Sequence, residues 1–254
     1  MSMPIPFKSE RARRSRPLRV AEAIKEWVVE KGLEPGDRLP GEAELIDLFG
    51  MSKGTIREAK RLLQAQGLVM TKTGPGGGSF VGEVSKDRAH ALLANYFYFQ
   101  SISIDDIYAV RVALEPEIAA SLAGRLSAAQ ISELEAVMAN YAEPARDADE
   151  ERQQHIDSLR FHALLAEFSD NRLLGFFVGF MSQILTDLTV FRKLYSEPNR
   201  QLWEQGRTHQ LDLISALRAG DANRARAVMR AHLQLARRLM EDQEAVVMKR
   251  FIAE

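Results

Sequence analysis

Residues 50–67 read Gly-Met-Ser-Lys-Gly-Thr-Ile-Arg-Glu-Ala-Lys-Arg-Leu-Leu-Gln-Ala-Gln-Gly, and they decide the fold of the N-terminal part of the chain. Ser52 is a residue type that caps the start of helices, and Gly67 is the type that ends them. Between them, apolar residues recur at helical spacing at positions 56, 59, 62 and 63. The stretch therefore predicts a helix from Lys53 to Gln66 with one buried face.

A β-hairpin is predicted directly after this helix. Residues 68–73, Leu-Val-Met-Thr-Lys-Thr, have strand character, and residues 79–81, Ser-Phe-Val, form the returning strand. Between them lies Gly-Pro-Gly-Gly-Gly at 74–78. Glycine lets the backbone turn freely and approach another molecule closely, so we expect a flexible tip there.

Two further helices are predicted upstream. One covers 17–31, with a proline in its first turn and a glycine at its end, and a shorter one lies between Pro40 and Gly50. Short helices followed by a glycine-tipped hairpin are the order of a winged helix-turn-helix. We expect this DNA-binding domain over residues 17–82.

The predicted DNA contacts come from the start of the third helix and from the hairpin. The N-terminal residues of such a helix reach base edges in the major groove, and its free amides favour a phosphate. Lys, Arg, Ser and Thr side chains can donate to bases or phosphates. The candidate DNA-binding residues are Arg38, Ser52, Lys53, Thr55, Arg57, Lys72, Thr73 and Gly76. The alternative is a small helical domain that contacts another protein. That alternative does not explain a glycine at position 54, near the start of the helix, or the glycine-rich tip of the hairpin.

Charge is distributed unevenly along the chain. Residues 1–82 carry 14 Lys and Arg against 10 Asp and Glu, and the remainder carries 20 against 25. A basic end suggests a polyanionic partner, although ordinary proteins also show such an asymmetry. Residues 1–16 are rich in Arg, Pro and Ser, so we expect a flexible basic tail that contacts phosphates or is simply solvated.

Composition limits the class of protein further. The chain has 254 residues, of which 46% are hydrophobic and 27% charged, values that fit a globular protein of one or two domains. It has no cysteine, which excludes disulfides and thiolate metal sites and favours a cytoplasmic location. No apolar run approaches the length that spans a bilayer, so we expect no membrane partner.

Residues 83–88 are predicted to be a linker, and residues 89–254 an all-helical domain for effector binding and dimerisation. Long helical periodicities fill this half of the sequence, and Ser103 and Ser127 are positioned to cap helices. We expect a bundle of about six or seven helices. The predicted helices cover 103–124, 128–141, 151–169, 171–195, 200–219 and 222–250. The fold class is therefore mainly α.

Three histidines fall on three separate predicted helices of this bundle. His162, His209 and His232 each lie beside apolar residues that face the core. Imidazoles that converge in this way suit Zn²⁺, Ni²⁺ or a similar divalent transition metal. The alternative is a metal-free pocket in which these histidines hydrogen-bond a ligand directly.

The N-terminal motifs resemble the DNA-binding domain of the GntR family. They are Arg38-Leu-Pro-Gly-Glu, Gly50-Met-Ser-Lys-Gly-Thr-Ile-Arg-Glu-Ala, Gly67-Leu-Val and Gly78-Ser-Phe-Val. The resemblance implies that Lys53, Thr55, Arg57 and Thr73 contact DNA. The sequence departs from the family at Ala43, where the family usually has an arginine, and at Lys53 and Gly54. These departures put the usual operator sequence in doubt, because Lys does not replace the bidentate contacts of Arg.

The helical half resembles the FCD effector domain of FadR-type GntR regulators. Its motifs are Arg111 with Glu115, Phe161-His162 with Asn171, and His209 followed by Ala216-Leu-Arg-Ala-Gly-Asp-Ala and His232. Metal-binding members use three histidines at these positions and an Asp four residues before the first, and they bind small carboxylates beside a nearby Arg.

The fourth metal ligand of that family pattern is missing from this sequence. The residue four before His162 is Ser158, so the ligand is lost, replaced by water, or supplied by His155 or by the effector. Arg111 is the candidate clamp for a carboxylate, and a salt bridge to Glu115 is its alternative role. The resemblance and the predicted helices give Arg111, Ser158 and Arg192 as candidate effector-binding residues.

These features predict a homodimeric transcription regulator, with repression of a double-stranded DNA operator relieved by a small organic acid. The chain is not expected to be an enzyme. The alternative is a helical metal-dependent hydrolase that carries a nucleic-acid-binding module, but no well-placed general base accompanies the histidines. An architectural DNA-binding protein without an effector is a third possibility.

Overall fold

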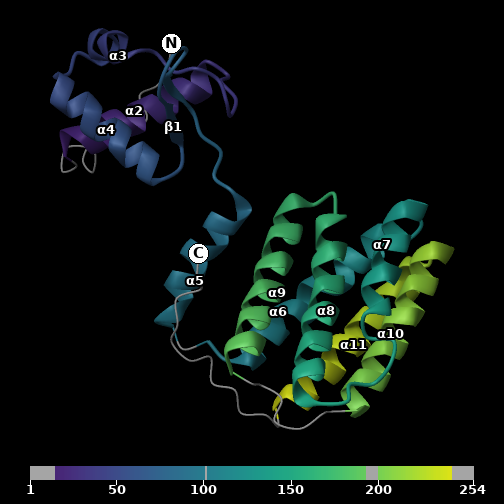
Figure 1. Ribbon diagram of the computed structural model, residues 1–254. Coiled ribbons are helices and arrows are strands. Elements are labelled where there is room, and N and C mark those ends of the chain that lie inside the picture. The colour runs from purple at the N-terminus through teal and green to yellow at the C-terminus, as the bar shows by residue number, and fades with distance from the viewer. Residues whose placement is uncertain (1–14, 101, 193–199, 242–254) are drawn as a thin grey trace, which may run out of the picture. The chain divides into compact units, whose positions relative to one another are not determined.

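The computed structural model describes residues 15–100, 102–192 and 200–241 (Figure 1). The chain divides into two compact units between Ala89 and His90, and each unit has a hydrophobic cluster of its own. Of the tail predicted over 1–16, only Ser15 and Arg16 lie in the described residues, and Arg16 already begins the first helix. The predicted mainly α class is confirmed.

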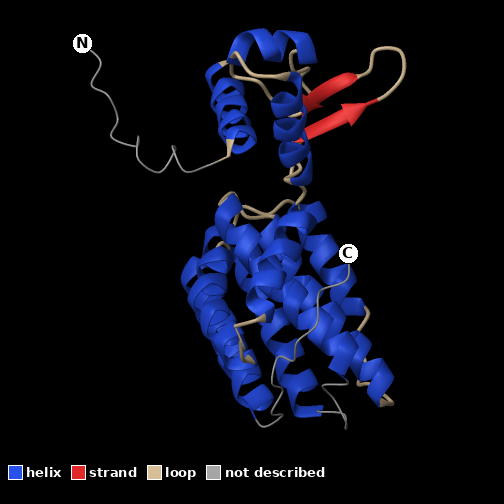
Figure 2. Ribbon diagram, turned by 90° about the vertical axis from the view of Figure 1, so that its left-hand side faces the viewer, coloured by secondary structure: helices blue, strands red, loops and turns tan. Residues whose placement is uncertain are grey.

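The first unit consists of three helices and a two-stranded antiparallel sheet (Figure 2). Its elements are α2 (Arg16–Glu30), α3 (Glu42–Phe49), α4 (Lys53–Ala65), β1 (Val69–Lys72) and β2 (Gly78–Val81). In the sheet, Val69 pairs with Val81 and Lys72 with Gly78. This order and pairing define a winged helix-turn-helix.

A single hydrophobic cluster holds this unit together. Every one of its helices and strands contributes at least one buried side chain, and Leu39 adds another. The buried members are Val20, Ala21, Ile24, Leu39, Leu45, Ile56, Ala59, Leu63, Val69 and Val81. Because the apolar face of α4 lies against α2, the opposite face of α4 and its N-terminus remain accessible.

The second unit is a bundle of helices. Its elements are α5 (Lys86–Tyr98), α6 (Ile104–Leu122), α7 (Ala128–Ala139), α8 (Ala148–Glu167), α9 (Arg172–Arg192), α10 (Arg200–Ala219) and α11 (Ala222–Glu241). The most extensive packing is between α6 and α11, α8 and α9, and α10 and α11. None of the helices within the described residues is long and apolar enough to cross a membrane.

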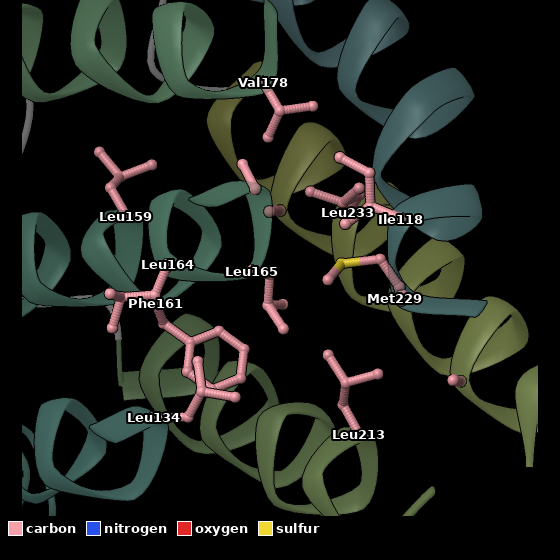
Figure 3. Close-up of a cluster of buried hydrophobic side chains, with 14 of the residues drawn as sticks. Ile118, Leu134, Leu159, Phe161, Leu164, Leu165, Val178, Leu213, Met229 and Leu233 are labelled. Atoms are coloured by element: carbon pink, nitrogen blue, oxygen red, sulfur yellow. The ribbon is translucent and has the colours of Figure 1, made fainter. Parts of the chain in front are cut away.

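The core of the bundle is formed by aliphatic side chains around Phe161 of α8 (Figure 3). Phe161 is completely buried, its ring lies beside Leu134 of α7 in this view, and Leu213 of α10 belongs to the same cluster. On the other side of the cluster, Ile118 of α6 lies close to Leu233 of α11. This packing fixes α6, α8, α10 and α11 relative to one another, and these four helices supply nearly all of the cavity described below.

The helix ends follow local sequence signals. Ser103 and Asp106 form a reciprocal capping box at the start of α6, as predicted, and Ser127 caps α7 together with Gln130. Most predicted helix ends within the described residues agree to within two residues, and two larger differences remain. Helix α5 begins at Lys86, inside the segment predicted as a linker. Helix α8 begins at Ala148 rather than at residue 151, because the Asp147 carboxylate accepts the first free amides.

Candidate functional site

The N-terminus of α4 presents two hydroxyl groups to solvent. Ser52 caps the helix: its Oγ accepts a hydrogen bond from the backbone amide of Thr55 and lies 3.0 Å from the Thr55 hydroxyl. No atom lies within 4 Å of the position that a Cβ on Gly54 would occupy. The start of the helix is therefore open, with hydroxyls and backbone dipole directed outward.

Two cations of α4 share one carboxylate of α3. Nε of Arg57 donates to Glu42 at 2.8 Å, and Nζ of Lys53 lies 3.5 Å from the other oxygen of Glu42. The hydrogen bond from Arg57, reinforced by the charges of Arg57 and Lys53, lowers the pKa of Glu42. More than half of each cationic side chain remains exposed. The carboxylate thus orients both cations without burying them.

The wing is held by a side chain outside it. Arg38 donates from its guanidinium to the carbonyl of Gly77 at 2.9 Å, and the Lys72 ammonium lies 4.8 Å from the centre of the Phe80 ring. Gly76 has a φ of +77°, and a Cβ on Gly77 would lie 2.6 Å from the Lys72 carbonyl. These positions require glycine, because a side chain would strain or block the tight turn. Thr73 lies at the exposed start of the same turn.

A cavity with several polar side chains in its wall lies inside the helical bundle. Its wall is formed by α6, α8, α10, α11 and Tyr141, and its volume is about 70 Å³. On this scale one water molecule needs about 10–15 Å³, so the cavity holds roughly five water-sized groups. The lining residues are Tyr108, Arg111, Tyr141, Glu151, Gln154, His155, Ser158, Leu159, His162, Trp203, Gly206, Arg207, Gln210, His232, Leu233 and Ala236.

One buried carboxylate connects a guanidinium and an imidazole at the edge of this cavity. Glu115 accepts a hydrogen bond from Nε of Arg111 with one oxygen, and its other oxygen lies 2.6 Å from Nδ1 of His162. Burial acts to raise the pKa of Glu115, but the charge of Arg111 and the contact with His162 outweigh it and lower the value to about 2. Glu115 is therefore ionised and fixes the orientation of both partners.

Arg111 is 1% exposed, and one of its terminal nitrogens has no hydrogen-bond partner among the residues that the structure describes. Its guanidinium also lies 5.1 Å from the centre of the Tyr108 ring. Both roles considered for Arg111 therefore coexist: it pairs with Glu115, and it still offers a buried donor on the cavity wall. Buried donors normally have a partner, so this one is available to a ligand.

Two of the predicted metal ligands face one another. Nε2 of His162 lies 3.1 Å from Nε2 of His232, and burial lowers the pKa of both imidazoles, so both are neutral. Zinc–nitrogen bonds of about 2.0–2.1 Å in tetrahedral geometry place two nitrogens about 3.3 Å apart. The spacing of the pair therefore fits a shared ion. Glu115 on Nδ1 of His162 is the supporting contact that a metal-bound imidazole usually has.

The third predicted ligand lies beside this pair. The ring of His209 makes an edge contact with His232 at 5.9 Å between ring centres, and its buried Nδ1 has no hydrogen-bond partner in the described part of the chain. Across residues 15–100, 102–192 and 200–241, no three His, Asp or Glu side chains are arranged closely enough to hold a metal ion. The donor types fit a transition metal, whereas the observed spacing brings only two of them together.

Ser158 belongs to a hydrogen-bonded chain that the sequence did not reveal. The hydroxyl of Tyr141 donates to the Gln210 side-chain oxygen at 3.0 Å, and Gln210 donates from Nε2 to Oγ of Ser158 at 3.1 Å. The indole of Trp203 donates to the Tyr141 carbonyl. Gln210 follows His209 directly, but neither it nor Tyr141 carries a motif. Arg192, the remaining candidate, ends α9, and its side chain lies outside the described residues.

A winged helix-turn-helix with exposed cations, together with a helical bundle that contains a cavity lined partly by charged and polar side chains, is typical of a DNA-binding transcription regulator with an effector domain. Comparison with known families supports this class directly. Residues 17–81 match the family described as bacterial regulatory proteins, gntR family, and residues 106–235 match the FCD domain. The chain belongs to the GntR family and carries an FCD effector-binding domain.

Individual relatives agree with this assignment. The putative L-lactate dehydrogenase operon regulatory protein of Escherichia coli is 30% identical over 237 residues, which cover 87% of this chain and 85% of that protein. The transcriptional regulator LutR of Bacillus subtilis is 26% identical over 202 residues, covering 79% and 90%. These relatives are transcription regulators, so the chain is a regulator and the hydrolase alternative is wrong.

A solved structure agrees with the fold. The GntR protein of Streptococcus agalactiae superposes with a TM-score of 0.61 at 22% identity, covering 88% of this chain and 99% of that protein. At this level of identity the likeness concerns the fold alone.

Proposed function

We propose that this regulator is a repressor that binds a double-stranded DNA operator as a homodimer and releases it when a small carboxylate enters the cavity of the helical unit. The observation that carries the effector part is the buried donor of Arg111, a residue of the cavity wall, which has no hydrogen-bond partner in the described part of the chain. A carboxylate would satisfy this donor with a charge-assisted hydrogen bond. The size of the cavity limits the ligand to a small acid.

The DNA part of the proposal rests on the exposed N-terminus of α4. Ser52, Lys53, Thr55 and Arg57 would enter the major groove, while the wing brings Lys72, Thr73 and Gly76 to the adjacent backbone. Arg38 would act mainly by holding the wing tip through Gly77. In a homodimer two such helices would occupy successive major grooves of a near-palindrome.

A divalent transition metal, Zn²⁺ or Ni²⁺, is part of the proposal. His162 and His232 would hold it through their Nε2 atoms, and His209 would join them after its ring turns toward the pair. When bound, the ion would supply positive charge that attracts a carboxylate. Glu115 keeps the Nδ1 proton on His162, so that Nε2 offers its lone pair.

The name of one relative also favours a small acid. The Escherichia coli protein is named for the L-lactate dehydrogenase operon, and lactate is a short hydroxy acid that fits roughly five water-sized groups. Such a ligand can release DNA only by binding one conformation of the regulator more tightly than another.

The DNA part is tested by measuring affinity for an operator duplex that the protein itself selects from a random pool. We expect Lys53→Ala and Arg57→Ala each to weaken operator binding about tenfold. Each variant should also reduce the slope of log affinity against log salt concentration by about one, the amount expected for one lost phosphate contact. Lys25→Ala on α2 is the control and should bind like the parent. Folded Lys53→Ala and Arg57→Ala variants that bind as tightly as the parent would overturn the proposal.

The effector part is tested by adding acids to the same complex. L-lactate and other acids of two to five carbons are titrated into the protein–operator complex, and operator release is followed by fluorescence anisotropy. We expect at least one acid to release the operator from the parent and to fail with Arg111→Gln. If no acid of this size changes operator affinity, the effector part is wrong.

A further inference from the structure

We propose that the acid recognised in the cavity carries two carboxylates: Arg111 binds one of them, and Arg207 of α10 binds the other. The inference rests on the proposed function, since it specifies the class of acid that the same cavity takes. It adds Arg207, which neither the sequence motifs nor the family match single out, as the residue that selects a dicarboxylate over a monocarboxylate.

Arg111 provides the first anion-binding position. Its Nε is already used by Glu115, and its terminal nitrogen on the cavity wall has no partner among the described residues. The guanidinium is fixed by Glu115 on one side and by the Tyr108 ring on another, so it cannot swing out to solvent. One carboxylate of the ligand is therefore held at the α6 wall.

Arg207 provides the second position. It lines the same cavity from α10, and its Nε is buried without a hydrogen-bond partner in the described part of the chain. Among the ion pairs of the described residues, none involves the Arg207 guanidinium. A buried donor of an unpaired guanidinium is satisfied best by an anion, because a charge-assisted hydrogen bond is about twice as strong as a neutral one.

The two guanidinium groups belong to different walls of the cavity, because Arg111 lies on α6 and Arg207 on α10. A ligand that bridges them must place its own charges apart, as an open-chain dicarboxylate does.

The polar chain of Gln210, Ser158 and Tyr141 belongs to the same cavity wall. Since Oγ of Ser158 accepts from Gln210, its own proton is free to be donated to a ligand. The space for roughly five water-sized groups corresponds to about 150 Å³ of liquid, which suits a dicarboxylate of three to five carbons.

Charge balance favours a dianion over a monoanion. Two guanidinium groups line the cavity, and the ion pair with Glu115 is formed by Arg111, not by Arg207. A dicarboxylate would give each guanidinium an anionic partner in the ligand, whereas a monocarboxylate would serve only one of them.

The experiment compares succinate with butyrate, which have the same number of carbons but differ by one carboxylate. Binding to the full chain is measured by isothermal titration calorimetry at saturating Zn²⁺. We expect the parent to bind succinate at least tenfold more tightly than butyrate, since the second carboxylate gains a charge-assisted contact. Arg207→Gln should reduce succinate affinity to that of butyrate and leave butyrate affinity unchanged.

Arg218→Gln is the matched control, because Arg218 lies on the same helix and pairs with Glu135 on the surface. The Arg218→Gln variant should bind succinate more tightly than butyrate by the same factor as the parent. Equal affinity of the parent for the two acids, or an unchanged preference in Arg207→Gln, would overturn the inference. If succinate binds as expected but never releases the operator, the inference stands and the proposed function fails; if neither acid binds, both fail.

Discussion

Nδ1 of His162 lies 2.6 Å from Oε2 of Glu115, and both side chains are almost completely buried. The other oxygen of Glu115 accepts from Arg111, so a single carboxylate satisfies a cation of α6 and an imidazole of α8. Burial of three polar groups in an apolar bundle is tolerated only because each has a partner. The stability of the bundle therefore depends on this carboxylate.

Replacing Glu115 with Gln should destabilise the helical unit strongly. The substitution leaves the charge of Arg111 buried without its counter-ion, and removal of one partner of a buried ion pair costs about 3–5 kcal/mol. Urea denaturation followed by circular dichroism measures the free energy of unfolding. Glu117→Gln, two residues further along α6, is the control, because its ion pair with Arg226 lies at the surface. An equal decrease in the free energy of unfolding in Glu115→Gln and Glu117→Gln would contradict the prediction.

The stability of the bundle should fall with acidification partly through His155. Burial, followed by the charge of Arg111, lowers the pKa of His155 from 6.5 to about 3. Between these values the unfolded chain binds a proton that the folded chain does not. The contribution of neutral His155 to the free energy of unfolding is therefore complete above pH 6.5. It is lost as the pH falls toward 3, by at most about 1.4 kcal/mol per pH unit.

His155→Gln tests this pH dependence. Free energies of unfolding measured at pH 7, 6 and 5 should decline less steeply for the variant than for the parent, because Gln takes up no proton in the unfolded state. Parallel curves for the two proteins would show that His155 is protonated to the same extent in the folded and unfolded chains.

Metal retention should depend on the histidine pair. After incubation with Ni²⁺ and gel filtration, elemental analysis should find about one ion per chain in the parent and much less in His162→Ala and His232→Ala. His90→Gln is the control, because His90 packs against Phe176 and Phe180 instead. A parent that retains no ion, or alanine variants that retain as much as the parent, would exclude this site.

Glu42→Gln should tighten binding to duplexes of unrelated sequence. The Glu42 carboxylate pairs with Lys53 and Arg57 at the N-terminus of α4, so under the proposed DNA contacts it would compete with DNA phosphates for both cations. The variant should also show a steeper salt dependence, measured by fluorescence anisotropy at several KCl concentrations. Glu58→Gln, whose carboxylate pairs with Arg61 instead, should change little. Weaker binding by Glu42→Gln would indicate that the carboxylate mainly positions Arg57.

Gly175→Ala should destabilise the packing of α8 against α9. A Cβ at position 175 would lie 2.5 Å from the carbonyl oxygen of Ala166, and a backbone atom cannot move aside without separating the helices. We expect a loss of about 1–3 kcal/mol in thermal or urea denaturation. Gly54→Ala is the control, since nothing lies within 4 Å of that position. An equally stable Gly175→Ala variant would mean that the helices repack easily.

The sequence predicted the elements of the fold well, because their signals are local. The Ser103 capping box, the glycine that ends α4 and the helical spacing of apolar residues each act within one or two turns. Helix α5 was missed, because its start at Lys86 follows a run without apolar periodicity and its packing on Phe176 depends on a helix far along the chain.

The site was only partly predictable, because its decisive contacts join residues that are distant in sequence. The helical pattern predicted that His162, His232 and Ser158 face inward, the family resemblance indicated Arg111, and all four line the cavity. It could not show that Glu115 reaches His162 across 47 residues, or that Gln210 reaches Ser158 across 52. Periodicity indicates which face is buried, but it does not indicate which polar groups meet there.

The hydrophobic clusters of the two units have no residue in common. A substitution that reshapes the cavity therefore leaves the packing beneath α4 untouched, and the reverse also holds. Over evolutionary time, the choice of operator and the choice of metabolite can then drift separately. The same division suggests a chimera in which residues 1–89 are exchanged for those of a related regulator. Such a chimera would place a different set of genes under the control of the ligand of the helical unit.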